Sequence, residues 1–259
     1  MTGIFFLYAI ISLASLAGLG FLLGRYTFWL PGAPKEAPRL IMYHEVNPDQ
    51  SESGLNIHPE HFDRQIGQLV KKGYRFLTVS ELAAEIEAGA TRFYKTALIT
   101  FDDGFDNNYT HAFPILKKHA AKATIYLSPD YQGIPFLKNS QIQEMANSGL
   151  IEFGAHTLHH VNLTKTDAKM AEQEICRSKE KVRELSGQPC LSFAYPYGRY
   201  AEEHIDMLKQ AGFTSAVTTR KTPYCPDVAS LYKLPRLTGD GRMNRLQWNI
   251  ALLKGRYRL

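Results

Sequence analysis

The sequence predicts an α/β protein whose β-sheet is mainly parallel. Apolar runs rich in β-branched and aromatic residues alternate with segments whose apolar residues recur at helical spacing. Polar clusters also follow five of these runs, and in parallel α/β folds the carboxyl ends of the strands share the face on which active sites form. About seven strands in a domain of this size suit a closed barrel and an open sheet equally well.

The N-terminal segment is apolar. Residues 4–24 contain no charged side chain, and as a helix they would rise about 30 Å, the thickness of a bilayer hydrocarbon core. Tyr26 and Trp29 follow, as interfacial aromatic residues do in membrane anchors. A cleaved signal peptide is the alternative, but the first three residues lack its usual positive charge. We therefore expect an uncleaved, single-pass transmembrane helix at residues 4–24, followed by a linker at 25–38.

The globular domain is expected at residues 39–240. Its strands are predicted at residues 39–43, 97–101, 123–127, 151–155, 191–195, 215–218 and 231–234. Helical spacing predicts helices around residues 62–70, 142–146 and 205–211. A longer helix is predicted at residues 167–185, with Asp167 able to cap its first turn and Gly187 just beyond its end.

The last segment, residues 241–259, is basic and contains no acidic residue. Met243, Leu246, Ile250 and Leu253 recur at helical spacing and predict an amphipathic helix. Such a helix can pack on the domain or lie on a membrane surface. We favour packing on the domain, because the apolar stripe of an amphipathic helix usually covers a protein core.

Charge and cysteine content exclude several classes of protein. The formal net charge is +5 and no nucleic-acid-binding motif accompanies it, so nucleic acid is not expected as a partner. Cys176, Cys190 and Cys225 form no CxxC pair, which argues against a cysteine zinc site. One disulfide or three buried thiols remain, and buried thiols are favoured.

Two adjacent acids end one predicted strand. The run Thr100-Phe101-Asp102-Asp103-Gly104 brings two carboxylates together. They repel each other unless a cation or a shared proton compensates, and a divalent metal held by one of them would do so. A solvated Asp-Gly turn is the simpler explanation of this motif taken alone.

Three histidines follow another predicted strand. In Ala155-His156-Thr157-Leu158-His159-His160, four positions separate His156 from His160, so a helical turn would place both imidazoles on one side. His159, at a spacing of three, is the alternative second ligand. One carboxylate with two histidines leaves positions open for water and substrate, as a catalytic metal requires. We therefore predict a metal site built from an aspartate and two of these histidines.

Three more polar clusters fall at strand ends, and they are Tyr43-His44-Glu45, Tyr195-Pro196-Tyr197-Gly198 and Leu234-Pro235-Arg236. Pro196 and Gly198 constrain the backbone between them, which leaves the amide of Tyr197 free to face a ligand. The shared placement of all five clusters predicts an active site more strongly than any single motif does.

These residues resemble the motifs of the polysaccharide deacetylases of carbohydrate esterase family four, whose domain is also called NodB-like. Thr100-Phe101-Asp102-Asp103-Gly104 is similar to the family's first motif, and His156-Thr157-x-x-His160 is similar to its second, a His-Ser/Thr-x-x-His pattern. The resemblance covers roughly residues 38–240. It implies a distorted (β/α) barrel, a divalent metal that is usually Zn²⁺, and hydrolytic N-deacetylation of a polysaccharide.

The resemblance also assigns roles by position. It implies that Asp102 is the general base and that Asp103, His156 and His160 are the metal ligands. The turn at Tyr197 is similar to the family's third motif, in which the tyrosine amide helps to form the oxyanion hole.

Two departures from the family pattern affect the remaining roles. Ala194 stands where the family has an arginine, and Arg236 is the candidate replacement from another strand. The late Leu-x-His motif that supplies the catalytic acid is absent, whereas Leu40-Ile41-Met42-Tyr43-His44 is similar to the permuted arrangement of the poly-N-acetylglucosamine deacetylases. This resemblance makes His44 the expected acid and poly-β-1,6-N-acetylglucosamine the expected substrate.

Several alternatives remain open. Peptidoglycan, chitin-like oligomers and a lipid-linked sugar are other substrates, and an inactive carbohydrate-binding module or a membrane scaffold without chemistry are other classes. The expected partners are an N-acetylated glycan and a membrane. Arg25, Lys35 and Arg39 after the apolar segment favour a cytoplasmic domain by the positive-inside rule. The resemblance favours the extracytoplasmic side, which we expect here.

Overall fold

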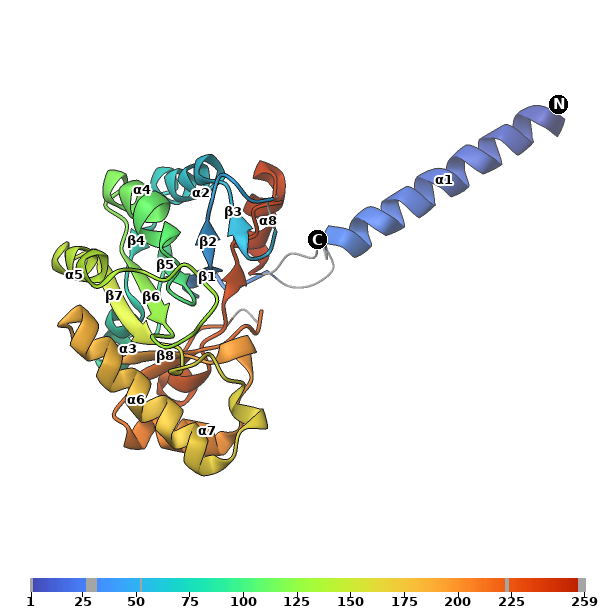
Figure 1. The fold of residues 1–259 in the computed structure, drawn as a ribbon. Coiled ribbons are helices and arrows are strands. Elements are labelled where there is room, and N and C mark those ends of the chain that lie inside the picture. Colours follow the sequence, from blue (N-terminus) through green and yellow to red (C-terminus); the bar gives the residue numbers. More distant parts are fainter. Residues whose placement is uncertain (1, 27–31, 52, 222–223, 256–259) are drawn as a thin grey trace.

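The structure, a computed structural model, describes residues 2–26, 32–51, 53–221 and 224–255. Its main sheet has eight strands paired in parallel, in the order β10-β1-β5-β6-β7-β8-β9 with β4 beside β5 (Figure 1). These strands are β1 (Arg39–Tyr43), β4 (Arg75–Phe76), β5 (Thr96–Phe101), β6 (Ala123–Leu127), β7 (Ile151–Ala155), β8 (Ser192–Ala194), β9 (Ser215–Val217) and β10 (Leu237–Thr238). The predicted α/β class and parallel sheet are confirmed.

Two short strands, β2 (Glu45–Val46) and β3 (Asn56–Ile57), pair separately in parallel just after β1. They were not predicted, because two residues carry too little periodicity to be recognised. Six of the seven predicted strands are confirmed. The seventh, at residues 231–234, is wrong. Residues Val228–Lys233 form a 3₁₀-helix there, because Asp227 caps its first turn by accepting a hydrogen bond from the Ser230 amide.

The two ends of the strand path approach each other through the segment that leads into β10. Val217 of β9 forms a single parallel bridge with Leu234, and three residues later Leu237 pairs with Ile41 of β1. The sheet therefore curves into an incompletely closed barrel. This closure brings residues near the C-terminal end of the domain against the first strand.

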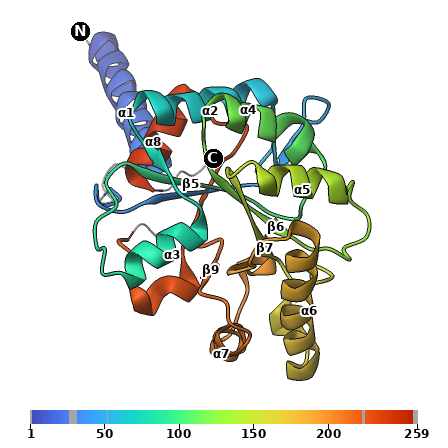
Figure 2. The ribbon, with the colours of Figure 1, turned by 90° about the vertical axis from the view of Figure 1, so that its left-hand side faces the viewer.

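Helices cover the strands on both faces (Figure 2). They are α2 (Pro59–Lys71), α3 (Val79–Glu87), α4 (Phe113–Lys118), α5 (Asn139–Asn147), α6 (Ala168–Ser186), α7 (Glu202–Gln210) and α8 (Arg245–Lys254). The predicted long helix is confirmed as α6. Asp167 accepts a hydrogen bond from the Met170 amide at its start, and Gly187 ends it in the left-handed conformation with φ 68°.

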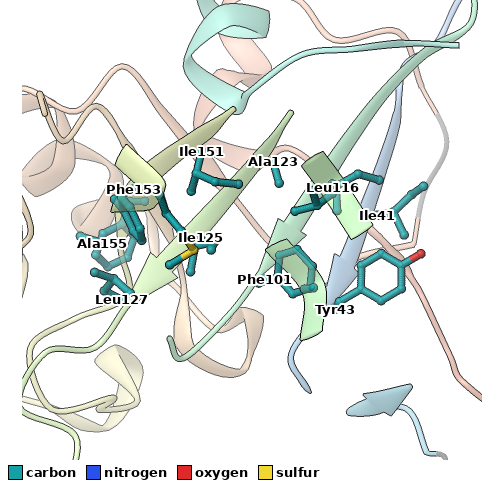
Figure 3. Close-up of a cluster of buried hydrophobic side chains, with 14 of the residues drawn as sticks. Ile41, Tyr43, Phe101, Leu116, Ala123, Ile125, Leu127, Ile151, Phe153 and Ala155 are labelled. Atoms are coloured by element: carbon teal, nitrogen blue, oxygen red, sulfur yellow. The ribbon is translucent and has the colours of Figure 1, made fainter. Parts of the chain in front are cut away.

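Alternation along the strands separates two apolar clusters. Odd-numbered side chains such as Ile41, Phe101, Ile125 and Phe153 pack with residues of α2, α4, α5 and α6 (Figure 3). Even-numbered side chains point to the opposite face, where Leu98 packs in the second cluster with residues of α3. Thr100 continues this even-numbered row and is fully buried. Hence the face of the sheet that carries the even-numbered side chains becomes polar toward the carboxyl end of β5.

The N-terminal segment forms helix α1 (Thr2–Tyr26). Within the part of the chain that the structure describes, no helix has both the length and the apolar character that a membrane crossing demands. The predicted transmembrane anchor at residues 4–24, and with it the membrane-anchored, extracytoplasmic localisation, is therefore wrong.

The C-terminal helix α8 packs on the domain through Trp248, Ala251 and Leu252. The predicted apolar stripe is wrong in part, because the side chains of Leu246 and Leu253 are more than half exposed. Arg39, which was counted as a charge flanking a membrane anchor, is buried. Its guanidinium donates hydrogen bonds to the carbonyl oxygens of Leu252 (2.6 Å) and Ala37 (2.6 Å), and so ties α8 to β1.

Candidate active site

Three side chains with metal-binding atoms meet beyond the carboxyl ends of β5 and β7. One ligand atom from each of Asp103, His156 and His160 lies within 4.8 Å of the other two. Asp103 Oδ1 is 3.6 Å from His156 Nε2 and 3.3 Å from His160 Nε2. The structure thus brings together the aspartate and the two histidines that the motifs singled out.

The two histidines converge through a bent loop, and the predicted helical turn at residues 156–160 is absent. Thr157 and His160 adopt left-handed backbone conformations, with φ of 61° and 57°, and Asp103 does so as well, with φ 74°. Each such conformation costs a non-glycine residue about 1 kcal/mol or more. Backbone strain of this kind clusters at functional sites, where it aims side chains that regular structure would point elsewhere.

A backbone carbonyl orients His156. The Nδ1 atom of this buried imidazole lies 2.7 Å from the carbonyl oxygen of Ala194. Because a carbonyl oxygen only accepts, Nδ1 carries the proton, and the lone pair of Nε2 faces Asp103. Burial lowers the pKa of His156 to about 3, which keeps the ring neutral. A neutral imidazole fixed in this way is the form that binds a metal.

His160, the third residue of the cluster, lies next to two tyrosine rings. The rings of Tyr131 and Tyr197 each lie 4.9 Å from its ring, measured between centroids. Burial lowers the pKa of His160 as well, so this imidazole is also held in its neutral form.

Asp103 has an environment that a cation would compensate. Among the described residues its buried Oδ1 accepts no hydrogen bond. Burial, reinforced by the neighbouring Asp102 carboxylate, raises the pKa of Asp103 to about 7. A buried carboxylate oxygen without a donor is costly, and here two neutral imidazole nitrogens face it. The donor set of one carboxylate and two imidazoles therefore fits a divalent metal ion.

Asp102 is fixed by a buried arginine. Arg236 donates from Nη1 to Asp102 Oδ1 and from Nη2 to Oδ2, each at 2.7 Å. Burial alone would raise the pKa of Asp102, but the Arg236 guanidinium outweighs it and holds that pKa well below its usual range. Arg236 also donates to Thr100 Oγ1 (3.0 Å) and to the carbonyl oxygen of Thr218 (3.1 Å). The guanidinium that contacts Asp102 thus comes from the segment before β10, and its equivalence to the arginine expected at Ala194 stays a prediction.

His44 lies on the other side of Asp102. Its Nε2 atom is 4.0 Å from Asp102 Oδ2, and burial lowers the pKa of the imidazole more than the carboxylate raises it. Asn108, which the sequence did not single out, donates from Nδ2 to the carbonyl oxygen of His44 at 2.7 Å. This bond fixes the backbone of His44 where β1 ends.

Tyr197 reaches the site through an unusual turn. It is the central residue of the 3₁₀ turn Pro196–Gly198 and has φ 60°. Its aromatic ring contacts His160, yet 58% of the residue is exposed. The turn therefore presents the Tyr197 ring beside the cluster, and the predicted role of its backbone amide stays a prediction.

His159 is the histidine that stays outside the cluster. Its Nδ1 lies 2.6 Å from Oε1 of Glu174, a buried residue of α6. The other oxygen of Glu174 accepts hydrogen bonds from the amides of Leu158 and His159. Glu174 therefore braces the loop that carries His156 and His160. Sequence reasoning missed this role, although a glutamate on the buried face of the predicted long helix was a usable signal.

The fold and the site define a class of protein, namely a parallel α/β barrel with an Asp-His-His metal-type cluster beside a buried Asp–Arg pair. Residues 90–216 match the family model described as polysaccharide deacetylase. Over these residues the chain is similar to the polysaccharide deacetylase family.

Individual relatives agree with this placement. The chain is 32% identical over 187 residues to YxkH of Bacillus subtilis, assigned to the polysaccharide deacetylases, covering 72% of this chain and 65% of the relative. It is 29% identical to the poly-β-1,6-N-acetyl-D-glucosamine N-deacetylase of Staphylococcus epidermidis, covering 69% and 66%. The structure of IcaB from Ammonifex degensii matches with a TM-score of 0.72 at 25% identity, covering 84% and 96%. The chain thus spans just under two thirds of the length of the first two relatives.

Proposed function

We propose that this protein is a hydrolase that removes N-acetyl groups from a polysaccharide containing N-acetylglucosamine, with poly-β-1,6-N-acetylglucosamine as the leading substrate. One observation carries the proposal. An Asp-His-His cluster suited to a metal lies directly beside a second carboxylate, Asp102, that a buried arginine keeps ionised. Separate carboxylates for the metal and for proton transfer are what hydrolysis of an acetamido group by activated water needs.

The residues proposed to hold the metal are Asp103, His156 and His160. Two imidazoles and one carboxylate match Zn²⁺ best among the divalent ions, and they leave coordination positions open. When bound, Zn²⁺ would act as a Lewis acid toward the acetamido carbonyl and would lower the pKa of a water molecule.

Asp102 is the proposed general base. Its carboxylate would take a proton from the attacking water, and Arg236 would hold both of its oxygens in place while it does so. The same guanidinium keeps Asp102 in the ionised, proton-accepting form at neutral pH.

Tyr197 and His44 are proposed to act on the two sides of the breaking bond. The Tyr197 amide would donate a hydrogen bond to the carbonyl oxygen as negative charge develops there. The proton that Asp102 takes from the water would pass to His44, and His44 would give it to the departing nitrogen as the C–N bond breaks. The products are acetate and a sugar amine. The distance of 4.0 Å between His44 Nε2 and Asp102 Oδ2 supports the assignment of both groups to one reaction centre.

The choice of substrate in this proposal is based on similar proteins. A homologue in Staphylococcus epidermidis is a poly-β-1,6-N-acetyl-D-glucosamine N-deacetylase, and its sequence aligns over 194 residues. The early placement of His44, ahead of the two aspartates, is similar to that subgroup's arrangement and supports the same substrate class.

Acetate release tests the proposal. The full chain is treated with a chelator, then supplied with Zn²⁺, and acetate is measured over β-1,6-linked N-acetylglucosamine oligomers, chitin-like oligomers and peptidoglycan. We expect release that disappears on chelation and returns with Zn²⁺, fastest on the β-1,6-linked oligomers. No acetate from any of these glycans would refute the deacetylase, and undiminished release after thorough chelation would refute the metal mechanism.

A further inference from the structure

A hollow with a volume of about 390 Å³ lies beside Tyr197. Asn162, Lys165, Tyr197 and Arg199 line it. Tyr197 connects the hollow to the reaction centre, because its ring also lies 4.9 Å from the ring of His160. The volume lies within the range of about 300–1,000 Å³ typical of small-molecule sites.

Two cations in this hollow have no carboxylate partner. Neither Lys165 nor Arg199 forms an ion pair with any residue that the structure describes, although both are exposed. The acid closest in sequence to Lys165 is Asp167, whose carboxylate accepts the Met170 amide at the start of α6. The positive charge of the hollow is therefore available to a ligand.

Ordered backbone presents these side chains. Lys165 ends the 3₁₀ turn Leu163–Lys165, and its amide donates to the carbonyl oxygen of Asn162 at 2.9 Å. The Oδ1 atom of Asn162 accepts from the amide (3.2 Å) and the hydroxyl (2.9 Å) of Thr164, which leaves Nδ2 as the donor end of this side chain. On the other wall, the Arg199 amide donates to the carbonyl oxygen of Pro196 at 3.2 Å.

We propose that this hollow is a subsite for an anionic group, a carboxylate or a phosphate monoester, on the sugar adjacent to the one that is deacetylated. The exposed ring of Tyr197 offers an apolar surface for the pyranose, and Lys165 and Arg199 would form charge-assisted hydrogen bonds with the anion. The inference rests on the proposed function for its choice of a glycan. It adds to the proposed, uncharged substrate a preference for N-acetylated glycans whose neighbouring sugar carries an acidic group.

Binding to sugars without acetamido groups tests the subsite separately from the reaction. The probes are three β-1,6-linked glucose trimers whose non-reducing sugar is glucose, glucuronic acid or glucose 6-phosphate. Their affinities for the zinc-supplied full chain are measured by isothermal titration calorimetry, together with the double variants Lys165→Gln/Arg199→Gln and Arg64→Gln/Lys71→Gln. The second variant removes the same two charges from the exposed side of α2 and serves as the control.

We expect an acidic trimer to bind the wild type about tenfold more tightly than the neutral trimer, the size of one hydrogen bond to a charged group. The ratio should fall to near one in Lys165→Gln/Arg199→Gln and persist in the α2 control. The tighter of the two acidic trimers identifies the anion. Equal affinity of all three trimers for the wild type, or a preference that survives in Lys165→Gln/Arg199→Gln, would overturn the subsite. Failure of acetate release would instead count against the deacetylase and leave these affinities interpretable.

Discussion

At the scale of single residues, adjacent carboxylates have opposite environments. Asp102 receives two charge-assisted hydrogen bonds from Arg236, which depress its pKa. Asp103 receives none from the described residues at its buried Oδ1, and burial raises its pKa to about 7. Two carboxyl groups whose pKa values are driven apart are suited to different tasks. The geometry therefore favours Asp102 for proton transfer and Asp103 for the metal.

Replacing Asp102 with asparagine should stop turnover without removing the metal. Asp102→Asn keeps the shape of the side chain but cannot accept a proton, so acetate release should fall by roughly 10²–10⁴-fold. Zinc content, measured by atomic absorption, should stay near that of the wild type because the ligand set is intact. Asp206→Asn on the exposed face of α7 is the matched control. Wild-type acetate release by Asp102→Asn would contradict the assignment of the base.

Removing the partner of Asp102 should destabilise the fold. Arg236→Met leaves a buried carboxylate unpaired, which costs about 3–5 kcal/mol of unfolding free energy. Combining it with Asp102→Asn should restore part of this loss, because the uncompensated charge is gone. Urea denaturation of the two single variants and the double variant measures the coupling, with Arg64→Met on α2 expected to stay within about 0.5 kcal/mol. Additive losses in the double variant would argue against the pair.

At the scale of elements, the loops after the strands carry the geometry of the site. Left-handed residues occur after β5 (Asp103), after β7 (Thr157 and His160) and after β8 (Tyr197). The regular strands place the functional residues at one edge of the sheet, and these turns set the directions in which their side chains point. The turn Pro196–Gly198 is the tightest case, because Gly198 also has φ 65° and lies against Thr219.

Gly198→Ala should disturb the site more than an equivalent change elsewhere. A Cβ at Gly198 would lie 2.7 Å from the backbone nitrogen of Thr219, which cannot move aside as a flexible side chain can. Gly149→Ala has nearly the same φ, 70°, with no atom within 4 Å, and should lose only about 1–2 kcal/mol of stability. We expect a larger loss of stability for Gly198→Ala, together with reduced acetate release. Equal effects of the two variants, measured by urea denaturation and acetate release, would show that the turn is not constrained.

At the scale of the whole molecule, barrel closure assembles the site. His44 follows β1, Asp102 and Asp103 follow β5, and His156 and His160 follow β7. Arg236 lies next to Asp102 because the last segment of the domain returns to the first strand. The bridge from Val217 to Leu234 and the pairing of Leu237 with Ile41 hold that segment in place. The site therefore depends on both ends of the domain, and ligands held there should stabilise the entire fold.

Zinc should raise the thermal stability of the protein. Free Zn²⁺ at 100 times its Kd would add about 2.7 kcal/mol to the unfolding free energy, which corresponds to a Tm increase of about 5–10 °C for a domain of this size. Differential scanning fluorimetry of chelated and zinc-supplied protein measures the shift. Asp103→Ala should abolish it, whereas Asp206→Asn should retain it. An unchanged Tm across zinc concentrations would mean that the cluster does not bind the ion.

The sequence alone was sufficient to predict the elements and motifs that depend on short-range patterns of residues. Periodicity of apolar residues predicted six strands and helix α6. The motifs predicted a cluster of one aspartate with two of three histidines, and the family resemblance implied Asp103, His156 and His160. Local patterns failed for the residues 231–234, where a cap produced a 3₁₀-helix, and for the apolar stripe of α8. The predicted membrane anchor did not hold for the described part of α1.

The contacts between these groups depend on how the chain folds in three dimensions. Arg236 pairs with Asp102 across 134 positions in the sequence, and His159 faces Glu174 while His156 and His160 face Asp103. Spacing could not choose among the three histidines, because left-handed residues in the loop set their directions independently of helical geometry. Contacts between distant segments depend on the curvature and closure of the sheet, and no local pattern records these. The sequence therefore predicted which chemical groups the site contains, whereas the folded barrel determined which of these groups contact each other.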